Sequence, residues 1–250
     1  LAQAGSSTYT NASSYTEWSM LSYALRANYS WKDRYLFTGT VRWDGSSRFA
    51  DGKRWGAFPS AAVAWRITEE PFMEKTKNWL SNLKFRLSYG VTGNNYTQGS
   101  NYATSVVATG GSYYYGFADG TGKTPYWPSA IVNKDLTWEK TVHYNLGLDL
   151  DMLKSRLQFT GEAYIRDTKD MLTDGYALPA LYGADAPKQN TANLRTKGFE
   201  LSLAWKDQLT IAGKPFGYNV RVQLSDYDSE ITKYENESKT FAKDYYVGKK

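Results

Sequence analysis

The sequence has no cysteine and a single histidine, His143. The lack of cysteine excludes disulfides and thiolate-ligated metal sites. One histidine leaves almost no material for a histidine-based metal site or a serine triad. His143 lies between Val142 and Tyr144 in a strand-like run, where a polar side chain on one face of a strand is the simpler role. We therefore expect no metal, no cofactor and no catalytic triad.

Long apolar runs and clusters of one charge are also missing. No stretch of about 18 apolar residues exists, so no transmembrane helix is expected, and no signal-peptide pattern is present. The chain begins "LAQAGSSTYT" without a Met, which suggests a piece of a longer polypeptide. The 30 Lys and Arg and the 25 Asp and Glu are interleaved, with a basic cluster only in the terminal "GKK". Nucleic acid is therefore not an expected partner.

What the sequence does have is a strong alternation of apolar and polar residues. Such a pattern with period two predicts β-strands that bury one face. Eight runs show it: 21–31, 35–43, 61–67, 83–91, 142–150, 157–165, 199–205 and 218–224. Most are longer than the five or six residues that are common in soluble strands. The sequence thus predicts an all-β protein of about eight strands.

The connections between these runs fall into two classes. Short ones join the first pair through 32–34, the fifth and sixth runs through 151–156, and the last pair through about 206–217. Those at 44–56, 92–137 and 168–196 are longer. The link at 68–82 is intermediate, and its "EEPFMEKTKNWL" predicts one helical turn. Short turns on one edge and long loops on the other are typical of outer-membrane β-barrels.

The aromatic residues, 16% of the chain, agree with this layout. Trp31, Tyr35 and Trp205 flank short turns, whereas three others lie near the opposite strand ends: Trp43, Trp55 and Phe58. Such placement is typical of the aromatic girdles at both membrane surfaces. A soluble β-sandwich with these aromatics in its core would show the same alternation. That alternative stays open at this point.

Five phrases in order then carry a family resemblance. They are "KDRYLFTGTVRWDGSSRF" (32–49), "WGAFPSAAVAWRITEEPFM" (55–73), "LSNLKFRLSYGVTGNN" (80–95), "DLTWEKTVHYNLGLDLDMLKSRLQFTGEAYIRDTKDML" (135–172) and "TKGFELSLAW" (196–205). Together they resemble the C-terminal barrel region of SusC/RagA-type TonB-dependent outer-membrane transporters of Bacteroidetes. The match covers most of the chain, from about residue 32 to residue 205.

The resemblance implies an antiparallel transmembrane β-barrel segment, about eight strands of a 22-stranded barrel. It also implies a Gram-negative outer membrane, membrane lipid around the wall, and pairing with the remainder of the barrel. The family imports oligosaccharides or peptides with a SusD-like surface lipoprotein and couples to TonB through an N-terminal region and a plug, neither of which is seen in this sequence. No enzymatic step is expected. A passive porin-type barrel is a close alternative, because the N-terminal region distinguishes the two.

The candidate substrate site is the stretch "GGSYYYGFADGTGKTPYWP", residues 110–128. Aromatic faces stack on sugar rings or apolar side chains, and the surrounding polar groups hydrogen-bond to a ligand. The candidate residues are Tyr113, Tyr114, Tyr115, Phe117, Tyr126 and Trp127. The same aromatics could instead pack the loop against its neighbours or the lid protein. "DGYALPALYGADAPKQN" (174–190) is a second candidate of this kind.

Three other sets of residues are of types found in catalytic or ligand-binding sites, but their context favours a structural role. In "RWDGSSRFADGKRWGAF" (42–58), Asp44, Gly45 and Ser46 are typical turn formers, and Arg42 and Arg48 are candidates to bridge carboxylates in neighbouring loops. "GVTGNN" (90–95) lacks the Lys-Ser/Thr of a phosphate loop, so turn chemistry is predicted.

Several carboxylates could be proposed as a glycosidase pair: Asp149, Asp151, Glu162, Asp167 and Asp170. They lie on strand faces or ends near Arg156, Arg166 and Lys169, which favours a hydrated, charged barrel lumen. A secreted glycoside hydrolase is the rival interpretation, and it requires a pair of carboxylates placed around a sugar.

Overall fold

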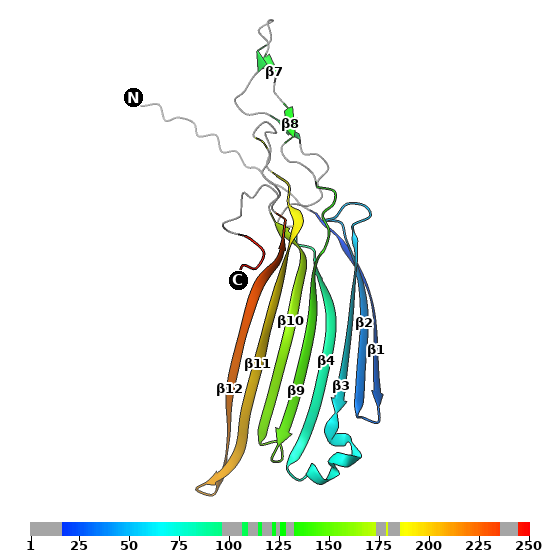
Figure 1. Cartoon of the computed structure of the whole chain (residues 1–250). Coiled ribbons are helices and arrows are strands. Elements are labelled where there is room, and N and C mark those ends of the chain that lie inside the picture. Colours follow the sequence, from blue (N-terminus) through cyan, green and yellow to red (C-terminus); the bar gives the residue numbers. More distant parts are fainter. Residues whose placement is uncertain are drawn as a thin grey trace, which may run out of the picture.

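A computed structural model describes residues 17–96, 133–173, 179, 186–235 and 245–250, and the backbone of four short strands between residues 107 and 128. Eight long strands form one antiparallel sheet in chain order (Figure 1). They are β1 (Met20–Trp31), β2 (Tyr35–Ser46), β3 (Trp55–Arg66), β4 (Leu80–Asn94), β9 (Glu139–Met152), β10 (Leu157–Thr173), β11 (Gln189–Ile211) and β12 (Lys214–Tyr234). The eight predicted strands are confirmed.

The short turns between β1 and β2, β9 and β10, and β11 and β12 lie at one end of this sheet together with the β3–β4 connection, and the connections that follow β2, β4 and β10 lie at the other (Figure 1). The end with short connections also carries two 3₁₀ helices, η1 (Ile67–Glu69) and η2 (Pro71–Thr76), where one helical turn is predicted. Among the described residues, no helix is long and apolar enough to cross a membrane. The sequence therefore predicted correctly which connections share an end.

Several strand limits differ from those predicted. Lys206–Gly217 is not a loop: β11 and β12 continue through it and meet at Ala212 and Gly213, whose φ angles are 50° and 77°. Positive φ at two successive residues is the backbone of a tight hairpin turn. Likewise "GVTGNN" does not form a turn, because β4 continues to Asn94. Pairing with neighbouring strands extends both segments beyond the residues in which apolar and polar side chains alternate.

The alternation separates the sheet into two faces. The apolar face carries exposed side chains on every strand, among them Leu25, Phe37, Val63, Leu87, Leu146, Ile165, Leu203 and Val222. Along β4 its apolar residues run from Leu83 to Val91, about 26 Å of strand, which at a tilt of about 40° approaches the apolar height of an outer-membrane barrel. In the described residues no second sheet covers this face, which argues against the sandwich.

Aromatic rings lie near both ends of the apolar face. At the end with short turns the ring of Tyr35 stacks on those of Trp31 and Trp65, at centroid distances of 5.5 and 6.3 Å. At the other end Trp55 stacks on Tyr23 at 6.0 Å. These pairs agree with two aromatic girdles. The predicted girdle position of Phe58 is wrong, because this side chain is buried in a core cluster.

That core cluster lies at the end with long loops and consists of Phe49, Phe58, Leu136 and Trp138. β3 and β4 pair from Arg66 and Lys84 up to Ser60 and Gly90, and beyond this point they separate. The Phe58 ring packs there against Gly93, where a Cβ atom would lie 2.1 Å from its Cζ. The cluster therefore fills the place where the two strands part.

Candidate functional site

The polar face carries an ion cluster centred on Arg86 of β4. Its Nε and one terminal nitrogen donate to the two carboxylate oxygens of Asp149 on β9, at 2.9 and 3.0 Å. The same terminal nitrogen reaches Glu162 Oε1 on β10 at 2.7 Å. Lys84 Nζ lies 3.1 Å from Asp149, and Asn145 Nδ2 donates to Glu162 Oε2 at 3.2 Å. One guanidinium thus ties three strands together through charge-assisted bonds.

Gly147 makes this arrangement sterically possible. It pairs with Arg86 on one side and Glu162 on the other, and a Cβ atom there would lie 2.9 Å from the guanidinium carbon. The Arg86 side chain therefore lies flat across the backbone of β9. A side chain at position 147 would displace the guanidinium from its two carboxylates.

Beside this cluster is a polar hollow of about 530 Å³. Its polar lining comes from β10, β11 and β12: Thr160, Glu162, Glu200, Ser202, Arg221, Gln223 and Ser225. Glu200 lies directly opposite Glu162. Hydroxyl, amide and charged groups side by side can hydrogen-bond to water and other polar molecules, and the hollow lacks the mainly apolar lining of a specific small-molecule pocket.

Three of the carboxylates considered for a glycosidase pair are bound to arginines. Asp149 and Glu162 share the Arg86 guanidinium, and Asp167 is held by Arg195 at 2.6 Å. A carboxylate bound to arginine is stabilised in its charged form and makes a poor general acid. Within the described residues, no cluster of three metal-ligating side chains occurs. The geometry supports the lumen interpretation for Asp149 and Glu162, whereas Asp167 lies on the same face as Ile165, beyond the apolar part of that face.

The basic partners of these carboxylates differ from those the sequence indicated. Arg156 pairs instead with Asp207 at 3.3 Å, and Arg166 lies over the Tyr164 ring. Sequence reasoning missed Arg86 because Asp149 lies 63 positions away. Only the pairing of β4 with β9 brings the two together. The sequence signal that could have indicated these partners was the position of Lys84 and Arg86 on the same polar face of a strand.

The "RWDGSSRF" segment also differs from its prediction. Asp44, Gly45 and Ser46 are strand residues of β2, and the true connection is 47–54. Arg42 binds Asp44 in its own strand at 2.7 Å rather than a carboxylate in another loop. Arg48 donates to the Asn95 carbonyl at 3.2 Å, with its guanidinium carbon 4.1 Å from the Trp18 ring centroid. The motif therefore fixes the rim of the sheet.

The loop aromatics predicted to bind substrate lie largely outside the described residues. Tyr113, Tyr114 and Phe117 are among the residues that are not described, as are most of 174–190. Only the backbone is described for the other three. Tyr115 belongs to β6 (Tyr115–Gly116), which pairs with β7 (Gly122–Lys123); Tyr126 and Trp127 belong to β8 (Tyr126–Pro128), which pairs with β5 (Val107–Thr109). Their role remains a prediction.

At the opposite end, Glu70 lies between η1 and η2 and anchors the aromatic girdle. Tyr35 Oη donates to Glu70 Oε1 at 2.7 Å, and Trp65 Nε1 donates to the same oxygen at 3.1 Å. Arg34 reaches Oε2 at 3.4 Å. The hydrogen bonds from Tyr35 and then Trp65 lower the pKa of Glu70 below its ordinary value of 4.5. The carboxylate thereby fixes two stacked rings.

The fold and its two faces can now be compared with known proteins. A family model described as TonB dependent receptor-like, beta-barrel, matches residues 2–249. The chain belongs to this family. The TonB-dependent receptor SusC of Bacteroides thetaiotaomicron is 39% identical over 230 residues, which cover 91% of this chain and 22% of SusC. A TonB-dependent receptor of Formosa agariphila is 35% identical over 219 residues, 88% of this chain and 21% of the relative.

Solved structures agree with this membership in the TonB-dependent receptor family. The RagAB peptide importer in its closed-closed state matches with a TM-score of 0.74 and 28% identity, over 89% of this chain and 23% of that chain. The SusC/RagA resemblance is confirmed, and so is the barrel segment. The chain spans about a fifth of the length of the curated relatives it matches.

Proposed function

We propose that this chain forms part of the wall and the loops of a TonB-dependent importer in the outer membrane of a Gram-negative bacterium. The 39% identity to SusC across 91% of the chain carries the proposal. In this setting the apolar face contacts lipid, and the polar face around Arg86 lines a hydrated lumen. The end with the long connections then faces outward, as in other outer-membrane barrels. No chemical step is involved.

The substrates in this proposal are oligosaccharides or peptides, captured with a SusD-like surface lipoprotein. The match to the RagAB peptide importer supports peptides, and oligosaccharides are included because the resemblance to SusC/RagA-type transporters implies both. The loop aromatics Tyr113, Tyr114, Tyr115, Phe117, Tyr126 and Trp127 are the proposed contacts. Aromatic side chains suit both substrates because they stack on sugar rings and cover apolar peptide groups.

Uptake by cells that carry the whole protein tests the proposal. Deleting the gene should stop import of the oligosaccharides or peptides that the protein binds, and a protonophore should stop it equally in wild-type cells. Import that persists after the proton gradient has collapsed would instead identify a passive porin. Replacing Tyr126 and Trp127 by Ala should weaken substrate binding at least about tenfold, since each stacking contact contributes roughly 1 kcal/mol. The matched control replaces Tyr29, on the apolar face of β1.

A further inference from the structure

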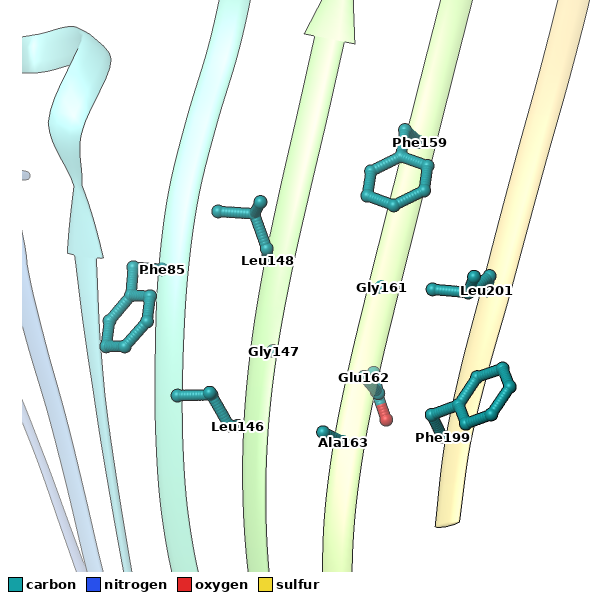
Figure 2. A pocket seen from close by; sticks show the side chains of 10 residues that line it. All are labelled: Phe85, Leu146, Gly147, Leu148, Phe159, Gly161, Glu162, Ala163, Phe199 and Leu201. Carbon is teal, nitrogen blue, oxygen red and sulfur yellow. The ribbon is translucent and has the colours of Figure 1, made fainter. Parts of the chain in front are cut away.

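The apolar face carries a marked hollow in the described part of the chain. About 420 Å³ in volume, it runs across β4, β9, β10 and β11. Its side-chain lining is Phe85, Leu146, Leu148, Phe159, Gly161, Ala163, Phe199 and Leu201 (Figure 2). In Figure 2, Phe85, Leu146 and Leu148 lie on one side, Phe159, Phe199 and Leu201 on the other, and the small residues between them. We call this hollow the lipid-side groove.

The groove exists because two small residues interrupt rows of large ones. Gly161 pairs with Leu148 and Leu201, and Ala163 pairs with Leu146 and Phe199. The large neighbours stay more than a third exposed; Leu146, for example, is 45% exposed. The small residues therefore form the floor, and the large side chains stand above them as walls. The Phe159 ring leans over Gly161, where a Cβ atom would lie 3.1 Å from its Cζ. A flexible apolar chain fits such a furrow.

The end of the groove at Ala163 and Phe199, the lower end in Figure 2, opens into a charged notch. A second hollow shares Ala163 and Phe199 with the groove and extends to Lys197, Asp226 and Asp228. Lys197 lies in the same cross-strand row as Ile165 and Tyr144. Tyr and Lys at one level are typical of the boundary between apolar lipid and head groups.

Two opposite charges in this notch have no ion-pair partner among the described residues. Asp228 is held by Lys250 at 2.9 Å, and nearby Asp167 by Arg195 at 2.6 Å. Lys197 and Asp226 form no ion pair in the described part of the chain. Lys197 lies opposite Asp228, and Asp226 lies opposite Phe199 in the next row of the same face. A lysine and a carboxylate that line one notch match a head group that carries both a phosphate and a primary ammonium group.

We propose that the lipid-side groove binds one phosphoethanolamine lipid, with its acyl chain over Gly161 and Ala163. Lys197 then contacts the phosphate, and Asp226 accepts hydrogen bonds from the ammonium group. The inference rests on the membrane placement of the proposed function. It goes beyond that function, because it assigns a lipid site to the outside of the wall.

The test uses the whole protein in phosphatidylcholine vesicles. Traces of phosphatidylethanolamine or phosphatidylcholine carry a photoactivatable acyl chain, and mass spectrometry counts lipid adducts on residues 157–165 and 57–65 after illumination. The ethanolamine probe should label 157–165 about fivefold more than the choline probe does, because Asp226 accepts hydrogen bonds from a primary ammonium group and choline has no N–H to donate. Ala163→Phe should abolish this excess. Ala61→Phe, an equal change at an exposed alanine of β3 outside the groove, should preserve it.

The head-group contacts have their own variants, Lys197→Gln and Asp226→Asn. Asp226→Asn should reduce ethanolamine labelling while choline labelling stays constant. Lys197→Gln should reduce labelling by both probes, because both head groups carry the phosphate that Lys197 contacts. Equal labelling by the two probes, or an Ala163→Phe variant that behaves like Ala61→Phe, would overturn the lipid site and leave the membrane placement intact. Cross-linking of Ala163 to a second protein chain would also overturn it. The absence of lipid adducts on both strands would refute the membrane placement itself.

Discussion

At the scale of single residues, the side of the sheet on which a residue lies decides what it contacts. Leu148 belongs to the apolar face, where 36% of it stays exposed. Asn145 lies on the polar face and donates to Glu162. The two positions are three residues apart on β9 and therefore point to opposite sides. The same substitution, made at each of the two positions, therefore distinguishes a lipid-facing position from a lumen-facing one.

Replacing Leu148 with Arg should destabilise the inserted protein by about 2–4 kcal/mol, because the charge enters the apolar part of the bilayer. Replacing Asn145 with Arg should be tolerated, since that side chain faces water and Glu162. The fraction of whole protein that stays folded in the outer membrane, measured by its heat-resistant mobility in gels, compares the two. Equal damage at both positions would refute the assignment of the faces.

Arg86 is the residue whose loss should matter most on the polar face. Arg86→Met leaves Asp149 with Lys84 alone and Glu162 with Asn145 alone, at an expected cost of about 1–3 kcal/mol. The matched control is Arg221→Met, because Arg221 forms no ion pair in the described residues. Guanidinium unfolding of the whole protein from liposomes measures both. Similar midpoints for the two variants would show that the cluster contributes little.

At the scale of elements, the end of β2 and its connection to β3 contact the residues that follow β4 and those that precede β9. Trp138 Nε1 donates to the Arg54 carbonyl at 2.9 Å, and the Trp138 ring packs edge-on against Phe58. Asn95 Nδ2 donates to Ser46 Oγ at 3.3 Å. The loop end of the sheet is thus held by packing and hydrogen bonds where the strands no longer pair.

Two glycines of β4 test this fit with the same substitution. A Cβ atom at Gly93 would lie 2.1 Å from Phe58 Cζ, whereas one at Gly90 would lie 3.5 Å from Ser60 Cβ, an ordinary contact. Gly93→Ala should therefore cost about 1–3 kcal/mol through overpacking, and Gly90→Ala should cost much less. Thermal unfolding of the whole protein in detergent measures the difference. If Gly90→Ala were the more harmful change, Phe58 would not occupy the described position.

The anchor at the other end is sensitive to acid. The lowered pKa of Glu70 means that its charged form stabilises the folded state above its ordinary pKa of 4.5, and this stabilisation is lost as the pH falls further, through the folded-state pKa. Glu70→Gln should therefore lower stability at neutral pH and flatten its decline below about pH 4.5. Unfolding midpoints between neutral and acidic pH compare it with Glu74→Gln in η2. Parallel pH curves for Glu70→Gln and the wild type would contradict the anchor.

At the scale of the whole molecule, the sheet leaves two edges and one apolar face without protein partners in the described residues. Among the residues that the structure describes, no strand pairs with the outer edge of β1, and the outer edge of β12 pairs only through Ile231 with residues 248 and 249. Lipid does not tolerate unpaired backbone groups. Partners for both edges are expected from the remainder of the barrel.

The 250-residue chain alone should not form a folded monomer in water. Its apolar face would be exposed over eight strands, and open strand edges promote aggregation. Size-exclusion chromatography and circular dichroism without detergent test this, with the whole protein in detergent as the control. A monomeric chain with a cooperative β-sheet transition would revive the soluble alternative.

The sequence by itself determined the strands, their two faces and the ends at which they connect, because alternation and turn chemistry are local properties of the chain. It also predicted the family correctly. It failed at Phe58, at the turn residues of "RWDGSS" and at the partners of Asp149 and Glu162. Those features depend on which strands become neighbours. Pairing of β4 with β9 across a long connection brings Arg86 to Asp149, and separation of β3 from β4 makes room for Phe58. Contacts between residues far apart in the chain are set by the sheet, so only the tertiary structure decided them.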